Sequence, residues 1–385
     1  MSAPTPADPP ADSPVPAPVP AISSVFPALV LGTATFNHQY HPDPQSMPSN
    51  AIVARALSLG LYAFDTSPYY GPSEILLGAA LTSALAANPV PRSSLFLITK
   101  AGRYGPTNFD YSPPSIRASV MRSLERLNTP YLDLVYCHDA EFVSPQDVLA
   151  AVGELRKLRD EGKIRYVGIS GYPLPVLTSL TKLVLQETGE PLDAVQSYSN
   201  FNLQNTTLAD DATLNAFRES KVSIVVNASI LSMGLLTTRG IDASPMAVWH
   251  PAPSGLRKAC TDLQHITEEA GFSLEDASIR WAIDSWAGAG AEFGTTKSPL
   301  GAGRLMGVTA IGVTSVDQLD ATWRVWEEIV EEKKSEGAKS TASKTHAVKK
   351  LAQDRIWPTL GAWKDYTWDS PGEDYVPTGP SRPAE

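Results

Sequence analysis

The feature that most constrains this chain is a regular alternation of short runs rich in β-branched and aromatic residues with longer segments of helical periodicity. This alternation is typical of βα units that build a parallel sheet. Eight runs are predicted to be strands: residues 28–31, 61–65, 95–100, 132–138, 165–170, 194–196, 223–227 and 309–313. Helices are predicted after them, over residues 50–59, 74–86, 115–127, 145–161, 174–187, 211–220, 274–286 and 316–331. Eight is the number of strands that closes a (β/α)8 barrel, so the sequence predicts an α/β protein with a TIM barrel.

Three regions fall outside the alternation and bound a predicted barrel over residues 28–335. Residues 1–27 hold many Pro and Ala but no Lys or Arg, which predicts a disordered leader and not a secretory signal; a Pro-rich recognition segment is the alternative. The glycine-rich residues 288–307 follow a predicted helix and not a strand, which indicates a mobile insertion and not a phosphate-binding loop. We expect residues 336–385 to pack on the barrel or to be partly disordered, because this extension carries Trp357, Trp363, Tyr366 and Trp368.

Composition limits the partners that the chain can have. The net charge of −10 repels phosphodiester backbones, so we do not expect nucleic acid binding. The two cysteines, Cys137 and Cys260, are far apart and predict neither a disulfide framework nor a metal site, which indicates a reducing, cytoplasmic location. No apolar run reaches the roughly 18 residues of a membrane span. We expect a monomer or weak homo-oligomer that acts on a small molecule.

Polar residues stand at the carboxyl ends of three consecutive predicted strands. Asp65, Lys100 and His138 each end a strand, and Tyr70 follows Asp65 by five residues. In a barrel these ends meet at one mouth, and four such residues together indicate a site, although each alone could be structural. An ammonium beside a phenol favours the phenolate, so we expect the pKa of Tyr70 to lie below its usual value of about 10. With His138 holding the substrate oxygen, the group predicts acid–base catalysis.

These residues carry a resemblance to a known family. The segment 64–74 (FDTSPYYGPSE), the strand that ends at Lys100 and the strand DLVYCH that ends at His138 resemble the Asp, Tyr, Lys and His tetrad of the aldo-keto reductases. The likeness runs from about residue 29 to about residue 326. Five further motifs resemble the subgroup of L-galactose dehydrogenases and NAD-dependent D-arabinose 1-dehydrogenases: KAGRY at 100–104, FDYS at 109–112, HDAEF at 138–142, NAS with SMGLL at 227–236, and WHPA at 249–252.

The resemblance implies a nicotinamide cofactor across the barrel mouth, no metal, and oxidation of an aldose at C1 to the aldonolactone. D-arabinose, L-galactose and L-fucose are the candidate sugars. Tyr70 would take the proton, Lys100 held by Asp65 would stabilise the phenolate, and His138 would orient the hydroxyl. Two alternatives stay open: an NADPH-dependent carbonyl or aldehyde reductase, and a non-catalytic nucleotide-sensing regulatory subunit.

The resemblance also implies a set of cofactor contacts: Thr33, Ser170, Gln196, Ala228, Ser229, Leu231, Gly234, Gly312, Thr314 and Gln318. Two positions depart from the family pattern, because Gly171 stands where many members have Asn and Ala228 where many have a stacking Tyr. NADP-binding members carry Lys or Arg in the loop that matches residues 311–320, and none is present here, so we expect NAD. Cations at Lys297 or Arg304 would favour NADP instead.

Substrate contacts are expected from loops that follow the third and seventh strands. The candidates are Arg103, Trp249 and His250, because polar and aromatic side chains over a barrel mouth can hold sugar hydroxyls and ring faces. For Trp249, packing within its own loop is the alternative.

Overall fold

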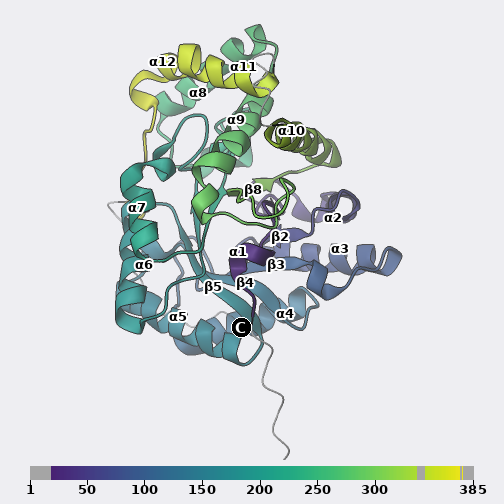
Figure 1. Cartoon of the computed structure of the whole chain (residues 1–385), viewed down its shortest axis with the longest axis vertical. Helices are drawn as coiled ribbons and strands as arrows, with labels where there is room; N and C mark the ends of the chain where they lie inside the picture. The colour runs from purple at the N-terminus through teal and green to yellow at the C-terminus, as the bar shows by residue number, and fades with distance from the viewer. Residues whose placement is uncertain (1–18, 336–342, 373–374, 376–385) are drawn as a thin grey trace, which may run out of the picture.

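The computed structural model describes residues 19–335, 343–372 and 375 and confirms the predicted (β/α)8 barrel (Figure 1). Each strand pairs in parallel with the next, and the last pairs with the first. The strands are β1 Leu29–Gly32, β2 Ala63–Asp65, β3 Phe96–Ala101, β4 Leu132–His138, β5 Ile164–Gly171, β6 Ala194–Tyr198, β7 Ile224–Ala228 and β8 Val308–Gly312. Within the described ranges, no helix is both long and apolar enough to cross a bilayer.

Helices surround the barrel in the order that the sequence predicts. They are α2 Ser49–Ser58, α3 Ser73–Ala87, α4 Pro113–Arg126, α5 Pro145–Asp160, α6 Leu174–Thr188, α7 Asp211–Glu219, α9 Leu274–Ala289 and α10 Val316–Lys334. The start of α5 shows why they begin where they do, since Ser144 and Asp147 form a capping box around Pro145. One long helix was not predicted: α8, Ser254–Glu269, lies between β7 and α9.

The alternation of side chains along the strands sets up the mouth of the barrel. Successive residues of a strand point to opposite faces, so in β4 Leu134 and Tyr136 pack inside the barrel while Val135 and Cys137 pack against the helices. His138 continues the inward series. Each strand brings at least one residue to the mouth in this way, among them Gly32, Asp65, Lys100, His138, Ser170, Gln196, Ala228 and Gly312. The mouth therefore has a polar half over β2 to β6 and an open half over β7, β8 and β1.

A short helix closes the opposite end of the barrel. Helix α1, Ile22–Val25, is followed by Phe26, which is fully buried among the inner residues with its ring 4.5 Å from that of Phe96. The Tyr166 hydroxyl donates a 2.6 Å hydrogen bond to the carbonyl of Pro20. The predicted disordered leader is thus wrong for residues 19–27, because their apolar side chains fill the barrel opening; residues 1–18 lie outside the described residues.

The insertion at residues 288–307 is tied to the same end of the barrel. Thr295 and Met306 form an antiparallel bridge, and the hydroxyl of Thr295 donates to the carbonyl of Ser23 at 2.9 Å. These contacts hold the base of the insertion against α1. The predicted mobility of the insertion stays a prediction.

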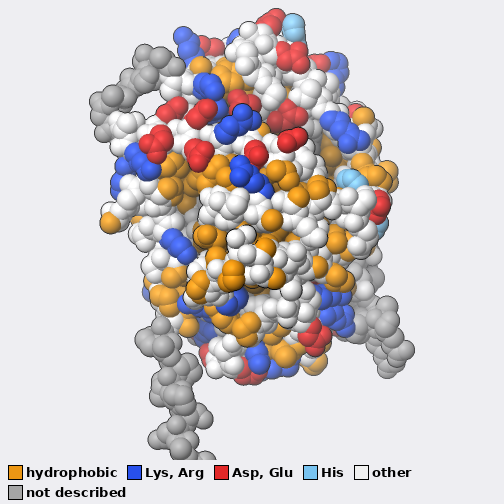
Figure 2. All heavy atoms as spheres, turned by 90° about the vertical axis from the view of Figure 1, so that its right-hand side faces the viewer, with side chains coloured by type: hydrophobic (Ala, Val, Ile, Leu, Met, Phe, Trp, Pro, Cys, Tyr) orange, Lys and Arg blue, Asp and Glu red, His pale blue; other side chains and the backbone are white. Residues whose placement is uncertain are grey.

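The part of the C-terminal extension that the structure describes, residues 343–372 and 375, packs on the barrel. Helices α11, Lys344–Leu351, and α12, Trp357–Leu360, lie beside α8 and α9 (Figure 1). Asp284 of α9 forms ion pairs with Lys333 of α10 and with Lys349 of α11. Figure 2 shows charged side chains of both signs gathered in the upper part of the face that it draws. Beyond α12, Trp368 stacks on Tyr172 with ring centres 4.6 Å apart, which brings the extension to the mouth.

Candidate active site

A cavity of about 840 Å³ opens at the carboxyl ends of the strands. All four predicted catalytic residues, Asp65, Tyr70, Lys100 and His138, line it. The cavity continues past the open half of the mouth into the loop after β7 and along the start of α10. The polar end of the cavity and the part that reaches α10 therefore form one continuous space. Among the described residues, no three His, Cys, Asp or Glu side chains are grouped as a metal site requires.

Asp65 and Lys100 form a buried ion pair at the polar end of the cavity. Lys100 Nζ donates to the carboxylate of Asp65 and to the carbonyl of Thr66, the second at 3.1 Å. Gln196 Nε2 donates to the other carboxylate oxygen of Asp65 at 3.0 Å. A buried ion pair persists only where its remaining polar atoms are satisfied. These contacts hold both charges in fixed positions.

Tyr70 lies between the ammonium and the imidazole, but its ionisation differs from the prediction. Lys100 Nζ lies 5.0 Å from the centre of the Tyr70 ring, and the ring of His138 lies 5.6 Å away at 90°. Burial raises the pKa of Tyr70 well above its usual value, Asp65 and Asp139 raise it further, and Arg103 lowers it. The predicted lowering is wrong for the free protein, because burial of the phenol and the two nearby carboxylates outweigh the effect of the cations. Tyr70 keeps its proton near neutral pH.

His138 is neutral and held by a neighbouring serine. Its Nδ1 lies 2.9 Å from Ser67 Oγ, which also accepts the backbone N–H of Tyr69 at 3.1 Å. Burial lowers the pKa of His138 to about 3, although Asp139 opposes this shift. A Ser67 hydroxyl that donates to Nδ1 leaves the imidazole hydrogen on Nε2. Nε2 can then donate to a substrate oxygen.

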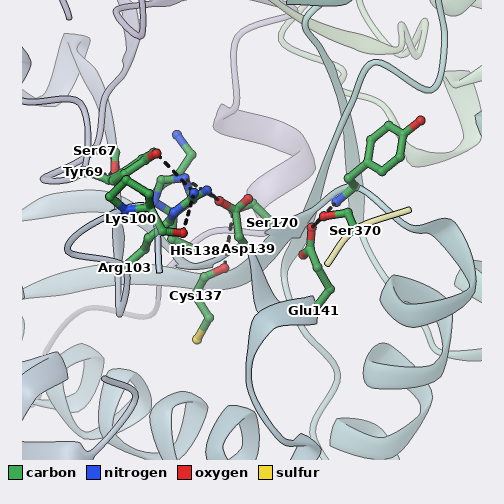
Figure 3. A network of polar contacts seen from close by, with 12 residues as sticks. Ser67, Tyr69, Lys100, Arg103, Cys137, His138, Asp139, Glu141, Ser170 and Ser370 are labelled. Atoms are coloured by element: carbon green, nitrogen blue, oxygen red, sulfur yellow. Dashed lines mark hydrogen bonds and ion pairs between the residues drawn. The ribbon is translucent and has the colours of Figure 1, made fainter. Parts of the chain in front are cut away.

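A second buried ion pair joins Arg103 to Asp139 (Figure 3). Arg103 also donates to the hydroxyl of Tyr69 at 3.1 Å, and its guanidinium lies 3.9 Å from the centre of that ring. Arg103 thus lines the cavity as predicted for a substrate contact, whereas Asp139 was not predicted. Asp139 is 3% exposed and adopts the left-handed backbone conformation, with φ 55°.

Of the other two predicted substrate contacts, one lines the cavity and the other does not. Trp249 lines the cavity, and its Nε1 donates to the carbonyl of Gln39 at 3.0 Å. His250 is 4% exposed and outside the lining; its Nε2 lies 3.2 Å from the carbonyl of Ser232, and burial lowers its pKa to about 4. His250 therefore supports the loop after β7.

Most of the predicted cofactor contacts line the cavity: Ser170, Gln196, Ala228, Ser229, Leu231, Gly234, Gly312, Thr314 and Gln318. Thr33 is fully buried, and its hydroxyl donates to the carbonyl of Asp65 at 3.0 Å, so it supports β2 instead. The open half of the mouth fits a flat ring and a long dinucleotide, because its strand ends carry only Gly or Ala. Lys297 and Arg304, the cations expected to favour NADP, are not among the residues of this lining.

The structure accounts for one departure from the family pattern, the glycine at position 171. A Cβ at Gly171 would overlap Oε2 of Glu141, whose carboxylate occupies that space. Glu141 Oε1 accepts the backbone N–H of Tyr172 and the hydroxyl of Ser370, each at 3.1 Å. Burial and the nearby Asp139 raise the pKa of Glu141 to about 8. Glu141 therefore links β5 to the C-terminal extension.

The cavity includes further side chains that sequence reasoning missed: Tyr40, Tyr69, Asp139, Phe142, Tyr198, Arg239, Glu275 and Trp368. Asp139 and Tyr69 directly adjoin predicted catalytic residues, which is a signal that could have found them. Trp368 could not have been placed at the mouth, because the path of the extension depends on contacts with residues far away in the sequence.

Comparisons with known proteins agree with this geometry. The model of the aldo/keto reductase family matches residues 28–338. The chain is 44% identical over 271 residues to a D-arabinose 1-dehydrogenase of Saccharomyces cerevisiae, covering 70% of this chain and 78% of that protein. It is 32% identical over 313 residues to an L-galactose dehydrogenase of Arabidopsis thaliana, covering 80% and 86%. The chain therefore belongs to the aldo/keto reductase family and is an NAD(P)-dependent oxidoreductase.

Proposed function

We propose that this protein oxidises an aldose at C1 to the aldonolactone, with NAD as the hydride acceptor. The observation that carries the proposal is the meeting of Tyr70, His138 and the Asp65–Lys100 pair at one end of the cavity, beside a buried carboxylate. The names of the two relatives, a D-arabinose and an L-galactose dehydrogenase, support the same substrate class. D-arabinose, L-galactose and L-fucose are the candidates to test.

The chemistry follows from the positions of the side chains. His138 Nε2 donates to the C1 oxygen of the sugar and orients its hydroxyl toward Tyr70. The ionised phenol of Tyr70 takes the hydroxyl proton, and Lys100 stabilises the phenolate. A bound NAD would supply the hydride acceptor, and loss of the hydride from C1 would turn the C1–O bond of the sugar into the lactone carbonyl. The proton then passes from Tyr70 to water.

Residues of the open half would hold the cofactor. Ser170 and Gln196 would contact the carboxamide of the nicotinamide, and the loop after β7, from Ser229 to Gly234, would contact the phosphates. Ser229 and Gly234 of this loop have positive φ and line the cavity, so the backbone of the loop comes close to the space that the cofactor would occupy. Gly312, Thr314 and Gln318 would border the adenosine.

Charge at the adenosine end supports NAD over NADP. The loop over residues 311–320 has no cation, and the carboxylate of Glu275 lines the same cavity, where it accepts two hydrogen bonds from Thr238. Arg239 also lines the cavity, so one cation is available near this end. Gln318→Arg should raise kcat/KM with NADP by about tenfold, because a forked cation can bind the 2′-phosphate. An unchanged ratio of NAD to NADP use would mean that Gln318 lies away from that phosphate.

One observation favours a second candidate function. Tyr70 keeps its proton near neutral pH, and a protonated phenol serves the reverse reaction, in which it donates to a carbonyl oxygen. NADPH-dependent reduction of an aldehyde or ketone is therefore the alternative.

We place the oxidation of the sugar in the cytoplasm, where nicotinamide cofactors are available.

The deciding experiment is a panel of aldoses, each assayed with NAD and with NADP by the absorbance of the reduced cofactor. We expect turnover of one or more of the three candidate sugars, with NAD preferred. The same protein is assayed with NADPH and simple aldehydes. Faster reduction of aldehydes than oxidation of any aldose would replace the first proposal by the second.

A further inference from the structure

We propose that Asp139, held by Arg103, binds the hydroxyl on C2 of the sugar and so selects polyhydroxy substrates over simple alcohols. This inference rests on the proposed function and extends it to a specificity-determining residue. Asp139 belongs to no predicted catalytic or cofactor set, yet it lines the cavity directly beside His138.

The first observation is that the conformation and burial of Asp139 are unfavourable for the free energy of folding. Its backbone has φ 55° and ψ 63°. These angles lie in the left-handed region, which is uncommon for residues other than glycine. Its carboxylate is also almost fully buried. Strained backbone and buried charge are both unfavourable for folding and are concentrated at functional sites. Two such costs at one residue of the cavity wall indicate a role in binding.

The second observation is that the carboxylate is held rigidly and stays ionised. The guanidinium of Arg103 pairs with Oδ2 and is itself fixed over the ring of Tyr69, with Phe142 at 5.4 Å on another side. Burial opposes ionisation of Asp139, but the charge and hydrogen bond of Arg103, together with the charge of Lys100, favour it, and the pKa is lowered. A fixed, ionised carboxylate accepts hydrogen bonds and cannot donate them. It therefore favours a ligand with hydroxyl donors.

The third observation is the position of the carboxylate relative to the reacting carbon. Asp139 Oδ2 lies 3.6 Å from Nε2 of His138, the nitrogen that would hold the C1 oxygen. The nearest other hydroxyl of an aldose is on C2, the carbon that is bonded to C1. Aromatic side chains of Tyr198 and Trp368 line the same cavity and offer faces for the C–H groups of a sugar ring. A substrate without the C2 hydroxyl would leave the acceptor positions of the carboxylate that Arg103 does not use without a donor.

The test compares two sugars that differ in that hydroxyl alone: D-arabinose and 2-deoxy-D-ribose, which is D-arabinose without its C2 oxygen. For the unmodified protein with NAD, we expect kcat/KM to favour D-arabinose by about 100-fold, as hydrogen bonds to a charged group allow. Asp139→Asn should reduce this preference to less than about fivefold, mainly by lowering kcat/KM for D-arabinose. Asp160→Asn, which removes an exposed carboxylate from the end of α5, should keep the full preference.

Each outcome bears on a different claim. If the role of Asp139 is only structural, or only electrostatic toward His138, Asp139→Asn would lower kcat/KM for both sugars equally and leave the ratio of the two values unchanged. That outcome would overturn the inference while the proposed function stands. Equal use of both sugars by the unmodified protein would overturn it too, even if Asp139→Asn failed to fold. Failure of the unmodified protein to oxidise any aldose would remove the proposed function itself.

Discussion

Burial decides the protonation states of the single residues at the barrel mouth. It raises the pKa of Tyr70 and lowers that of His138 to about 3, so both side chains are neutral near neutral pH. The charges of Asp65, Lys100, Arg103 and Asp139 are balanced in two separate ion pairs. Two neutral hydrogen-bonding groups, Tyr70 and His138, therefore face the substrate beside two fixed ion pairs.

These protonation states predict the dependence of the reaction on pH. Oxidation needs the ionised phenol, and below the pKa of Tyr70 the ionised fraction grows about tenfold per pH unit, so kcat/KM for aldose oxidation should rise steadily between about pH 7 and pH 9. Reduction needs the protonated phenol, so kcat/KM in that direction should stay level over the same range. Because the pKa of His138 is about 3, neither profile should show a step near pH 6.5. A level profile for oxidation would contradict the raised pKa of Tyr70.

At this scale, the sequence could predict which residues form the site but not their ionisation. Asp65, Lys100 and His138 could be found because each ends an apolar strand. The direction of the Tyr70 pKa shift could not, since it depends on burial and on the distances to two carboxylates, Asp65 and Asp139, which lie on different segments. Thr33 and His250 were expected at the site, but the structure uses both to support neighbouring backbone.

Strands and helices were the easiest features to predict, because their periodicity is local. The predicted strand ends lie within a few residues of the observed ones, and β4 matches fully. Helix α8 could have been found too, since Leu256, Cys260 and Leu263 recur at helical spacing. The left-handed turn at Asp139 could not, because no local pattern distinguishes a strained residue.

The contact between β5 and Glu141 gives a prediction at the scale of elements. Gly171→Ala should raise KM for the sugar severalfold and lower the free energy of unfolding by about 1–3 kcal/mol, because the new methyl group displaces Glu141 and with it Ser370. Steady-state kinetics and denaturant unfolding measure both effects. Gly153→Ala in α5 is the matched control: nothing lies near its Cβ position, so it should stabilise the protein by about 0.5–1 kcal/mol. Unchanged KM in Gly171→Ala would show that Glu141 does not position the extension.

At the scale of the whole molecule, segments from both ends of the chain complete the barrel. Helix α1 fills the amino-terminal opening, and the extension after α10 runs to the opposite mouth, where Trp368 and Ser370 line the cavity. Both arrangements depend on residues far apart in sequence, such as the contact between Tyr166 and Pro20. Composition alone predicted disorder for the first of these segments, because local sequence cannot show the opening that it fills.

The plug formed by α1 can be tested by stability. Phe26→Ala should lower the free energy of unfolding by about 3–5 kcal/mol, because a fully buried ring at the barrel opening is removed. Val248, which is 93% exposed, provides the control, since Val248→Ala should change stability by less than about 0.5 kcal/mol. Equal unfolding midpoints for the two variants in urea would mean that α1 does not close the barrel.

The most direct test of the central claim, that Tyr70 transfers the proton at the sugar oxygen, is the rate of hydride transfer in Tyr70→Phe under single-turnover conditions. The variant keeps the ring and loses the hydroxyl, so NAD affinity should stay within about twofold while hydride transfer to NAD falls by a factor of about 10³ or more. A rate within threefold of the unmodified protein would contradict the assignment of the acid–base residue and, with it, the mechanism derived for this cavity.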